Sequence, residues 1–262
     1  MKGIDVYHND NGGQPIDWPA VKSAGISFAF AKATESTDFV DSAFATNWPG
    51  MKDAGLVRGA YHFFHADVDP VAQANFFLAT VGPLSPGDML VLDMETTNGQ
   101  SQATIAAHAV TFLETVQSAT GTTPLLYTSP AFLSSYPGLG AFPLWVANYG
   151  VKCPDVPAEW TTYAFWQSSS KGTLGPITGV VDLDSFNGTL SDLLGTSDAG
   201  DDAAPEVDAA PEASDDAADE GTSPSEPGGG CGCVVGRESS RGDGLAAMAV
   251  GALVFARRRR RV

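Results

Sequence analysis

Basic residues are scarce in this chain, which has 14 lysines and arginines against 31 aspartates and glutamates and a formal net charge of −17. Because such an acidic surface repels the phosphate backbone, we expect no nucleic-acid partner. Cysteine is also rare: the chain has three, and only Cys153 falls in the first 195 residues. We therefore expect Cys153 to be an unpaired thiol, buried and inert.

Long apolar runs are missing as well. The longest candidate, residues 245–256, falls short of the roughly 20 residues that a spanning helix needs, so by hydropathy it is a marginal membrane segment. The first residues contain no apolar stretch followed by a small-residue cleavage site, and they do not match a secretion signal. Three explanations stay open: a start upstream of Met1, a signal already removed, or a C-terminal tail without a function.

The motifs of several enzyme classes are absent too. No glycine-rich nucleotide loop follows a predicted strand, and no serine lies in a nucleophile-elbow context. The histidines and aspartates at positions 62, 65, 67 and 69 have mixed spacing. We predict no metal site and no cofactor.

Composition divides the chain into three parts. Residues 1–195 are mixed and aromatic-rich, enough for one domain with a sizeable core. Residues 196–230 consist almost wholly of Ala, Asp, Glu, Gly, Pro, Ser and Thr, so we predict a disordered acidic linker. Residues 231–262 hold Cys-Gly-Cys, a short apolar run and five arginines at 257–261.

Within the first part, candidate strands alternate with candidate helices. This alternation predicts an α/β fold with a parallel sheet, and eight strands indicate a closed barrel resembling a TIM barrel, with fewer than eight helices because the intervals after residue 129 are short. The expected strands cover residues 3–7, 26–34, 57–64, 89–96, 124–129, 144–149, 163–169 and 180–186, and the expected helices cover 18–24, 43–54, 69–80 and 104–120.

Two acids close the apolar run Met-Leu-Val-Leu-Asp at 89–93. Side chains alternate along a strand, so Asp93 and Glu95 should point the same way. Two neighbouring carboxylates repel each other, and such a pair usually serves acid/base chemistry or metal binding. The alternative without a chemical role is that one of the two acids caps the next helix and the other is solvated at the edge of a loop.

Further polar and aromatic residues follow the other predicted strands. Because the carboxyl ends of barrel strands converge, we expect these side chains to form one groove. Aromatic faces stack on sugar rings, while acids and amides hydrogen-bond hydroxyl and N-acetyl groups, so the groove suits a sugar polymer. The residues concerned are Asp5, Lys32, Glu35, Tyr61, His62, Asp93, Glu95, Tyr127, Trp145, Asn148, Tyr149, Trp166, Gln167 and Asp182.

Eight motifs in order resemble the family 25 glycoside hydrolases, the Chalaropsis-type lysozymes, over residues 2–194. They are Gly-Ile-Asp-Val at 3–6, Phe-Ala-Lys-Ala-Thr-Glu at 30–35, Gly-Ala-Tyr-His-Phe-Phe at 59–64, Leu-Asp-Met-Glu at 92–95, Leu-Tyr-Thr-Ser at 126–129, Leu-Trp-Val-Ala-Asn-Tyr at 144–149, Phe-Trp-Gln-Ser at 165–168 and Val-Asp-Leu-Asp-Ser-Phe-Asn-Gly at 181–188. The resemblance implies a modified β/α barrel that cleaves the β-1,4 bond between N-acetylmuramic acid and N-acetylglucosamine in peptidoglycan.

The resemblance also implies site residues. The four acidic positions of the family fall on Asp5, Asp93, Glu95 and Asp182, with Asp184 as a competitor for Asp182. Glu95 is implied to be the general acid. The nucleophile is either an aspartate, Asp93 or Asp182, or the 2-acetamido group of the substrate; we favour the acetamido group, assisted by Asp93, with a retained anomeric configuration. The substrate-binding candidates are Tyr61, Tyr127, Trp145, Tyr149, Trp166 and Gln167.

Two other function classes stay open beside the muramidase. One is a catalytically silent module that binds the cell wall through the same groove, and the other is a glycosidase with a different sugar specificity. The presence of all four acids favours the enzyme.

The last 32 residues resemble the myxobacterial C-terminal sorting tail, in which Cys-Gly-Cys, an apolar helix and an arginine cluster follow one another. The resemblance implies attachment to the membrane or envelope through residues 231–262, with the arginines on the cytoplasmic side. We therefore expect an extracellular or cell-surface protein, and we expect it to be a monomer.

Overall fold

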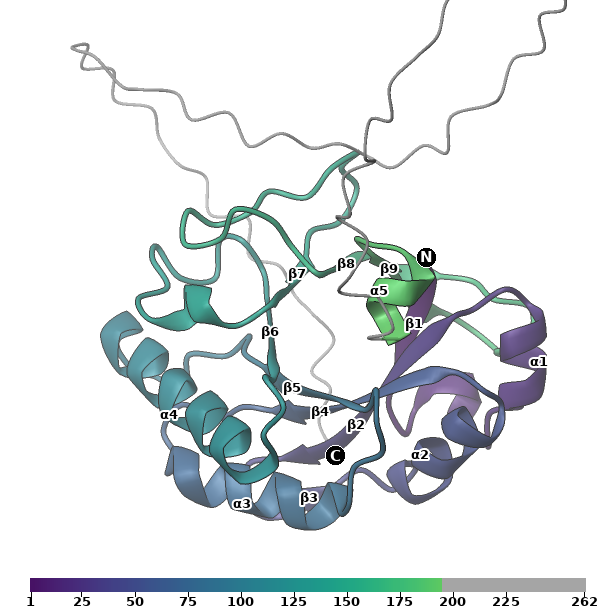
Figure 1. Ribbon diagram of the computed structural model, residues 1–262, viewed down its shortest axis with the longest axis horizontal. Coiled ribbons are helices and arrows are strands. Elements are labelled where there is room, and N and C mark those ends of the chain that lie inside the picture. The colour runs from purple at the N-terminus through teal and green to yellow at the C-terminus, as the bar shows by residue number, and fades with distance from the viewer. Residues whose placement is uncertain (195–262) are drawn as a thin grey trace, which may run out of the picture.

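The computed structural model describes residues 1–194, which form one closed barrel with helices along one side (Figure 1). The eight barrel strands follow one another around the sheet in the order β1-β9-β8-β7-β6-β5-β4-β2, and pairing of β1 with β2 closes the ring. The strands are β1 (Lys2–Val6), β2 (Phe28–Glu35), β4 (Val57–Phe63), β5 (Met89–Asp93), β6 (Leu125–Thr128), β7 (Leu144–Ala147), β8 (Phe165–Gly172) and β9 (Val181–Phe186), and the short β3 (Phe39–Val40) extends β2. The predicted linker at 196–230 and tail at 231–262 lie outside the described residues.

The predicted parallel sheet is wrong for one barrel strand. From β1 through β2 to β8 all neighbours pair in parallel, whereas β9 runs antiparallel to both β8 and β1. Only residues 173–180 connect β8 to β9. A parallel return needs a crossover of about a dozen residues or more, so the short connection brings the chain back antiparallel.

The helices are α1 (Trp18–Ser23), α2 (Phe44–Asp53), α3 (Pro70–Val81), α4 (Gln102–Thr120) and the terminal α5 (Leu190–Leu194). Four helices, α1 to α4, lie where the sequence predicts them, with ends shifted by a few residues, whereas the short α5 was not predicted. Asp69 caps α3 by accepting a hydrogen bond from the Ala72 N–H at 2.8 Å. Gly121, with φ 71°, ends α4 in the left-handed conformation that glycine adopts without a steric penalty.

Two apolar cores hold the barrel together. One fills the space between the strands and the helices and includes Leu92, Phe77 and Phe112. The other fills the barrel itself and includes Phe28, Phe30 and Phe165. Gly59 makes room for this inner core, because a Cβ atom there would lie 2.2 Å from the Phe30 ring.

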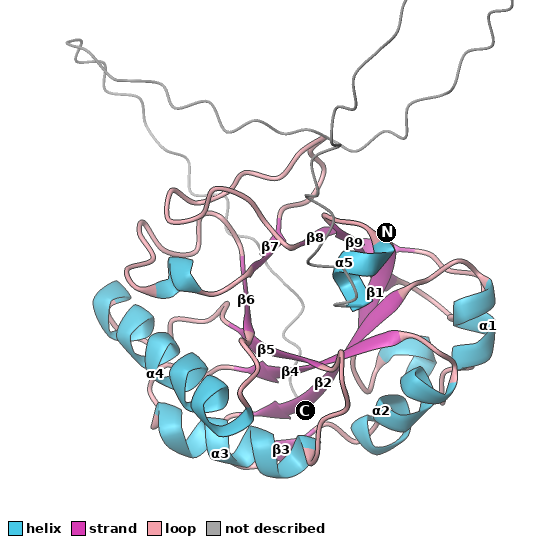
Figure 2. Ribbon diagram, in the orientation of Figure 1, coloured by secondary structure: helices cyan, strands magenta, loops and turns pink. Residues whose placement is uncertain are grey.

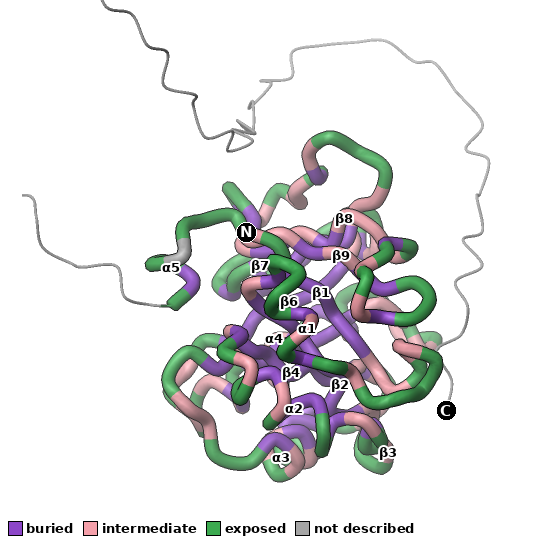
Figure 3. The backbone as a smooth tube through the Cα atoms, turned by 90° about the vertical axis from the view of Figure 1, so that its right-hand side faces the viewer, coloured by how far each residue is buried: buried purple, intermediate pink, exposed green. Residues whose placement is uncertain are grey.

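The two sides of the barrel are covered differently. Helices α1 to α4 pack along one side, and loops with a 3-10 turn at Leu139–Ala141 cover the side of β6 to β9 (Figure 2). Strands β1, β2 and β4 to β7 are almost wholly buried, β8 and β9 are partly exposed, and exposed residues gather in the connecting loops (Figure 3). Within residues 1–194 no helix is both long and apolar enough to cross a membrane.

Cys153 lies in the loop between β7 and β8 and is disulfide-bonded. The expectation of an unpaired thiol is therefore wrong.

Candidate active site

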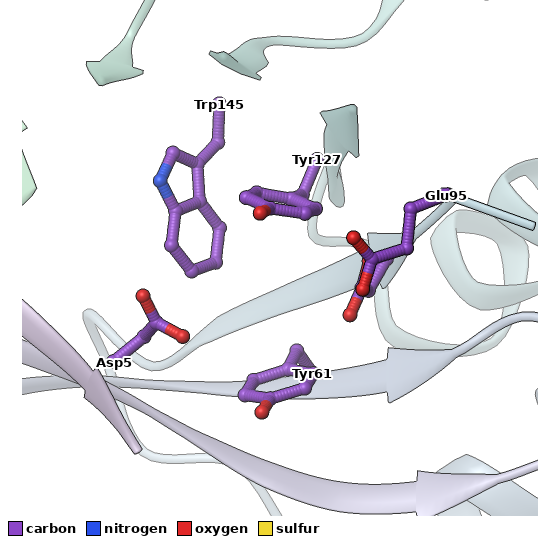
Figure 4. Close-up of a pocket in the computed structure, with 6 residues that line it drawn as sticks. Asp5, Tyr61, Glu95, Tyr127 and Trp145 are labelled. Atoms are coloured by element: carbon purple, nitrogen blue, oxygen red, sulfur yellow. The ribbon is translucent and has the colours of Figure 1, made fainter. Parts of the chain in front are cut away.

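Six of the ten predicted site residues line one pocket at the carboxyl ends of the parallel strands (Figure 4). β1 supplies Asp5 and β5 supplies Asp93, with Glu95 in the loop just beyond it, while aromatic rings come from three other strands. Figure 4 shows the Asp5 carboxylate and the Glu95 carboxylate on opposite sides of the pocket, with rings between them. The pocket-lining residues are Asp5, Tyr61, Asp93, Glu95, Tyr127 and Trp145.

Asp93 and Glu95 face the same pocket although the strand is shorter than predicted. β5 ends at Asp93, not at residue 96, so Glu95 belongs to the following loop. The Met94 N–H still donates to the Tyr127 carbonyl at 2.9 Å, and the Met94 side chain is fully buried in the outer core. This continues the strand-like alternation past the last β5 residue and directs its two acidic neighbours inward. Asp93 is buried and Glu95 is half-buried.

Asp5, which lies across the pocket from Glu95, belongs to a hydrogen-bond network centred on Gln167. Its side-chain amide donates to Asp5 Oδ2 at 2.5 Å and to Asp182 Oδ2 at 3.2 Å. Its carbonyl Oε1 accepts hydrogen bonds from the Tyr127 hydroxyl at 2.8 Å and from the Tyr149 hydroxyl. Burial, followed by the neighbouring Tyr149, Asp93 and Asp5, raises the pKa of Tyr127 well above its usual range, so its hydroxyl keeps its proton and donates.

The two predicted tryptophans lie on different faces of the sheet. Trp145 points into the barrel, where its ring stacks on Phe30 with centroids 4.3 Å apart. Trp166 packs against the core outside the barrel, and its indole N–H donates to the Asn148 carbonyl at 2.8 Å. The structure thus brings Trp145 to the pocket but not Trp166.

A second polar cluster, at the rim near β2 and β4, was only partly predicted. Lys32 donates to Glu35 Oε2 at 2.5 Å, and His65 Nε2 lies 3.0 Å from Glu35 Oε1. Burial alone would raise the pKa of Glu35, but the hydrogen bonds from His65 and Lys32 outweigh it and lower this pKa.

Asn98, which was not predicted from the sequence as a site residue, joins that cluster to the loop carrying Glu95. Its Oδ1 accepts from the Ala66 N–H at 3.1 Å and from the Thr96 hydroxyl at 2.9 Å, and its Nδ2 lies 3.3 Å from His65 Nδ1. The backbone of Asn98 has φ 47°. An Asn-Gly pair following a strand is the sequence signal for such a turn.

The histidine in β4 takes no part in the pocket. His62 is fully buried on the outer face, between the Thr34 hydroxyl at 2.8 Å from Nδ1 and Gln73 Oε1 at 3.1 Å from Nε2. Burial lowers the pKa of His62 to about 3. Its imidazole is therefore neutral and structural.

The chain is similar to known proteins in both sequence and fold. Residues 4–177 match the model of the family described as glycosyl hydrolases family 25. The chain is 36% identical over 214 residues to lysozyme M1 of Streptomyces globisporus, which covers 74% of this chain and 70% of the relative. It is 31% identical over 214 residues to the N,O-diacetylmuramidase of Chalaropsis sp., covering 74% and 97%. Its fold is similar to that of the solved bacterial lysozyme from Streptomyces coelicolor, with a TM-score of 0.70 and 35% identity over 75% of this chain and 96% of the other.

Proposed function

Since the chain belongs to the glycosyl hydrolases of family 25, we propose that it hydrolyses the β-1,4 bond between N-acetylmuramic acid and N-acetylglucosamine in peptidoglycan. The observation that carries this proposal is that Asp93 and Glu95 line one aromatic-walled pocket together with Asp5, which lies opposite Glu95 (Figure 4). The lysozymes and muramidases among its relatives support the same bond as the target.

Glu95 is the general acid in this proposal. It is the more exposed member of the pair, at the rim where a leaving glycosidic oxygen can reach it. A general acid must hold a proton at the working pH, and the neighbouring Asp93 favours the protonated form because two like charges repel. After the C–O bond breaks, the same carboxylate takes the proton from the incoming water.

Asp93 acts on the other side of the sugar. The 2-acetamido oxygen of the substrate attacks the anomeric carbon as the glycosidic bond breaks, and the Asp93 carboxylate accepts the amide N–H and stabilises the cation that forms. Water then opens the intermediate from the face of the departed group, so the configuration is retained. Asp93 lines the pocket wall whereas Asp182 does not, which favours Asp93 over Asp182 for this role.

The remaining residues hold the substrate and the charge. Asp5 and Asp182 share the Gln167 amide and adjust the position and potential of the wall opposite Glu95. The rings that line the pocket provide stacking surfaces for sugar rings. Among the substrate-binding candidates, position favours Tyr61, Tyr127 and Trp145, which line the pocket. Gln167 is buried behind them and accepts hydrogen bonds from the Tyr127 and Tyr149 hydroxyls.

We further propose that the protein acts outside the cytoplasm or at the cell surface as a monomer, attached to the envelope through residues 231–262. Peptidoglycan lies outside the cytoplasmic membrane, which supports this location. The tail lies outside the described residues, and its support is the sequence resemblance alone.

The test is digestion of purified peptidoglycan by the full chain, followed by borohydride reduction and mass spectrometry. Products that end in reduced N-acetylmuramic acid are expected. Products that end in reduced N-acetylglucosamine would indicate a different glycosidase, and binding to the insoluble wall without products would indicate a silent wall-binding module. Proton NMR of the first products should show the β-anomer, as retention requires.

A further inference from the structure

Asp184 is a buried acid that the proposed reaction does not use. It lies in β9 one pleat away from Asp182, so both side chains face the barrel interior. In the strand register Asp182 pairs with Asp5, and Asp184 pairs with Gly3. Asp184 is 4% exposed and does not line the pocket, so it cannot touch the substrate directly.

The surroundings of Asp184 leave one of its oxygen atoms without a donor. Oδ1 accepts a hydrogen bond from the Trp145 indole N–H at 2.9 Å. Among the described residues no N–H or O–H group donates to Oδ2, although that atom is fully buried. The Asp5 carboxyl lies within hydrogen-bonding reach of Asp184. Two carboxyl groups in such contact form a hydrogen bond only when one of them carries a proton.

Burial and the neighbouring charges determine whether Asp184 or Asp5 holds that proton. Burial, followed by the negative charges of Asp5 and Asp182, raises the pKa of Asp184 well above its usual range. Asp5 instead accepts a hydrogen bond from Gln167, which favours its ionised form. A proton on Asp184 therefore satisfies both buried groups.

We propose that Asp184 is a positioning residue, a neutral carboxylic acid that donates its proton to Asp5 while accepting from Trp145, and so fixes two walls of the pocket. In this arrangement Asp5 accepts from both Asp184 and Gln167, and Gln167 in turn accepts from Tyr127. Every buried proton of the network then has an acceptor. This inference rests on the proposed muramidase only where it concerns activity.

Infrared difference spectroscopy of the full chain tests the proton directly. The carbonyl band of a protonated carboxylic acid is separate from the bands of a carboxylate, and ¹³C-labelling of aspartate shifts it. We expect the wild-type protein at pH 7 to show a labelled protonated band that is absent from Asp184→Asn. Equal spectra of the two proteins in this region would show an ionised Asp184 and overturn the inference.

Two variants of similar shape test the positioning role. In Asp184→Asn the new side-chain amide can donate to Asp5 and its carbonyl can accept from Trp145, so kcat should stay within about threefold of wild type. Asp184→Leu removes both hydrogen bonds, and kcat should fall by about 10- to 100-fold with a smaller change in KM. Melting temperature and circular dichroism confirm that each variant is folded.

These measurements test the positioning role of Asp184 and the proposed muramidase activity separately. Wild-type kcat in a folded Asp184→Leu, or loss of activity in a folded Asp184→Asn, would overturn the positioning role. A protonated band in a wild-type protein that does not cleave peptidoglycan would contradict the proposed function and leave the proton on Asp184 established.

Discussion

His62 should make the stability of the barrel depend on pH between 7 and 5. Burial lowers the pKa of His62 to about 3 in the folded protein, against about 6.5 for a histidine in the unfolded chain. Between these values the unfolded chain binds a proton that the folded protein does not, so the free energy of unfolding falls as the pH falls. The contribution of His62 is fully present above the unfolded value and is progressively lost below it.

The size of this effect follows from the two pKa values. Integrating the linkage relation from pH 7 to pH 5, with the folded pKa at about 3, gives a loss of about 2 kcal/mol. For a domain of this size that corresponds to a fall in melting temperature of roughly 4 to 8 °C. Other groups also titrate in this range, so a variant that removes only the imidazole is needed.

His62→Gln is that variant, because glutamine does not titrate and can still hydrogen-bond to its neighbours. Urea unfolding, followed by tryptophan fluorescence at pH 7, 6 and 5, gives the free energy of unfolding for both proteins. We expect the wild type to lose about 2 kcal/mol more than His62→Gln between pH 7 and 5. Parallel losses in the two proteins would refute a neutral, buried His62.

Two further predictions concern the reaction and the buried ion pair between Arg58 and Asp88. Asp93→Asn should lower kcat by about 100- to 1000-fold. Mass spectrometry of the acid-quenched wild-type enzyme should find no glycosyl adduct, and an adduct on Asp93 or Asp182 would contradict the acetamido nucleophile. Asp88 holds the buried Arg58 by two hydrogen bonds of 2.8 Å, so Asp88→Asn should lower the free energy of unfolding by about 3 kcal/mol while leaving activity of the folded protein intact. The exposed Asp53→Asn is its control, and an equal effect of both variants would show that the ion pair does not stabilise the barrel.

Much of the fold could be predicted because local signals coincide with the elements. Buried apolar runs followed by polar residues mark the strands, and Asp69-Pro70 and Gly121 mark helix ends by capping chemistry that acts within a few residues. The direction of β9 was predicted wrongly, because it depends on which strands lie beside it and on the length of one connection. The end of β5 was also misplaced, since the alternation of inward and outward side chains continues past the last strand residue.

The site could be predicted where the carboxyl ends of parallel strands meet. That rule places Asp5, Asp93 and Tyr127 in one pocket regardless of the details of the loops. It could not assign Trp166 to the outer face, because one residue of register decides which face a side chain takes. The hydrogen bond from the Trp145 indole N–H to Asp184 joins residues 39 positions apart, and no local sequence pattern predicts it.

Glu95 is the proposed general acid of a muramidase. The direct measurement is the rate at which the full chain releases new N-acetylmuramic acid reducing ends from purified peptidoglycan, compared with Glu95→Gln. We predict that the variant binds the insoluble wall and melts like the wild type but releases products at less than roughly a hundredth of its rate. A folded Glu95→Gln with appreciably more activity than this would contradict the assignment.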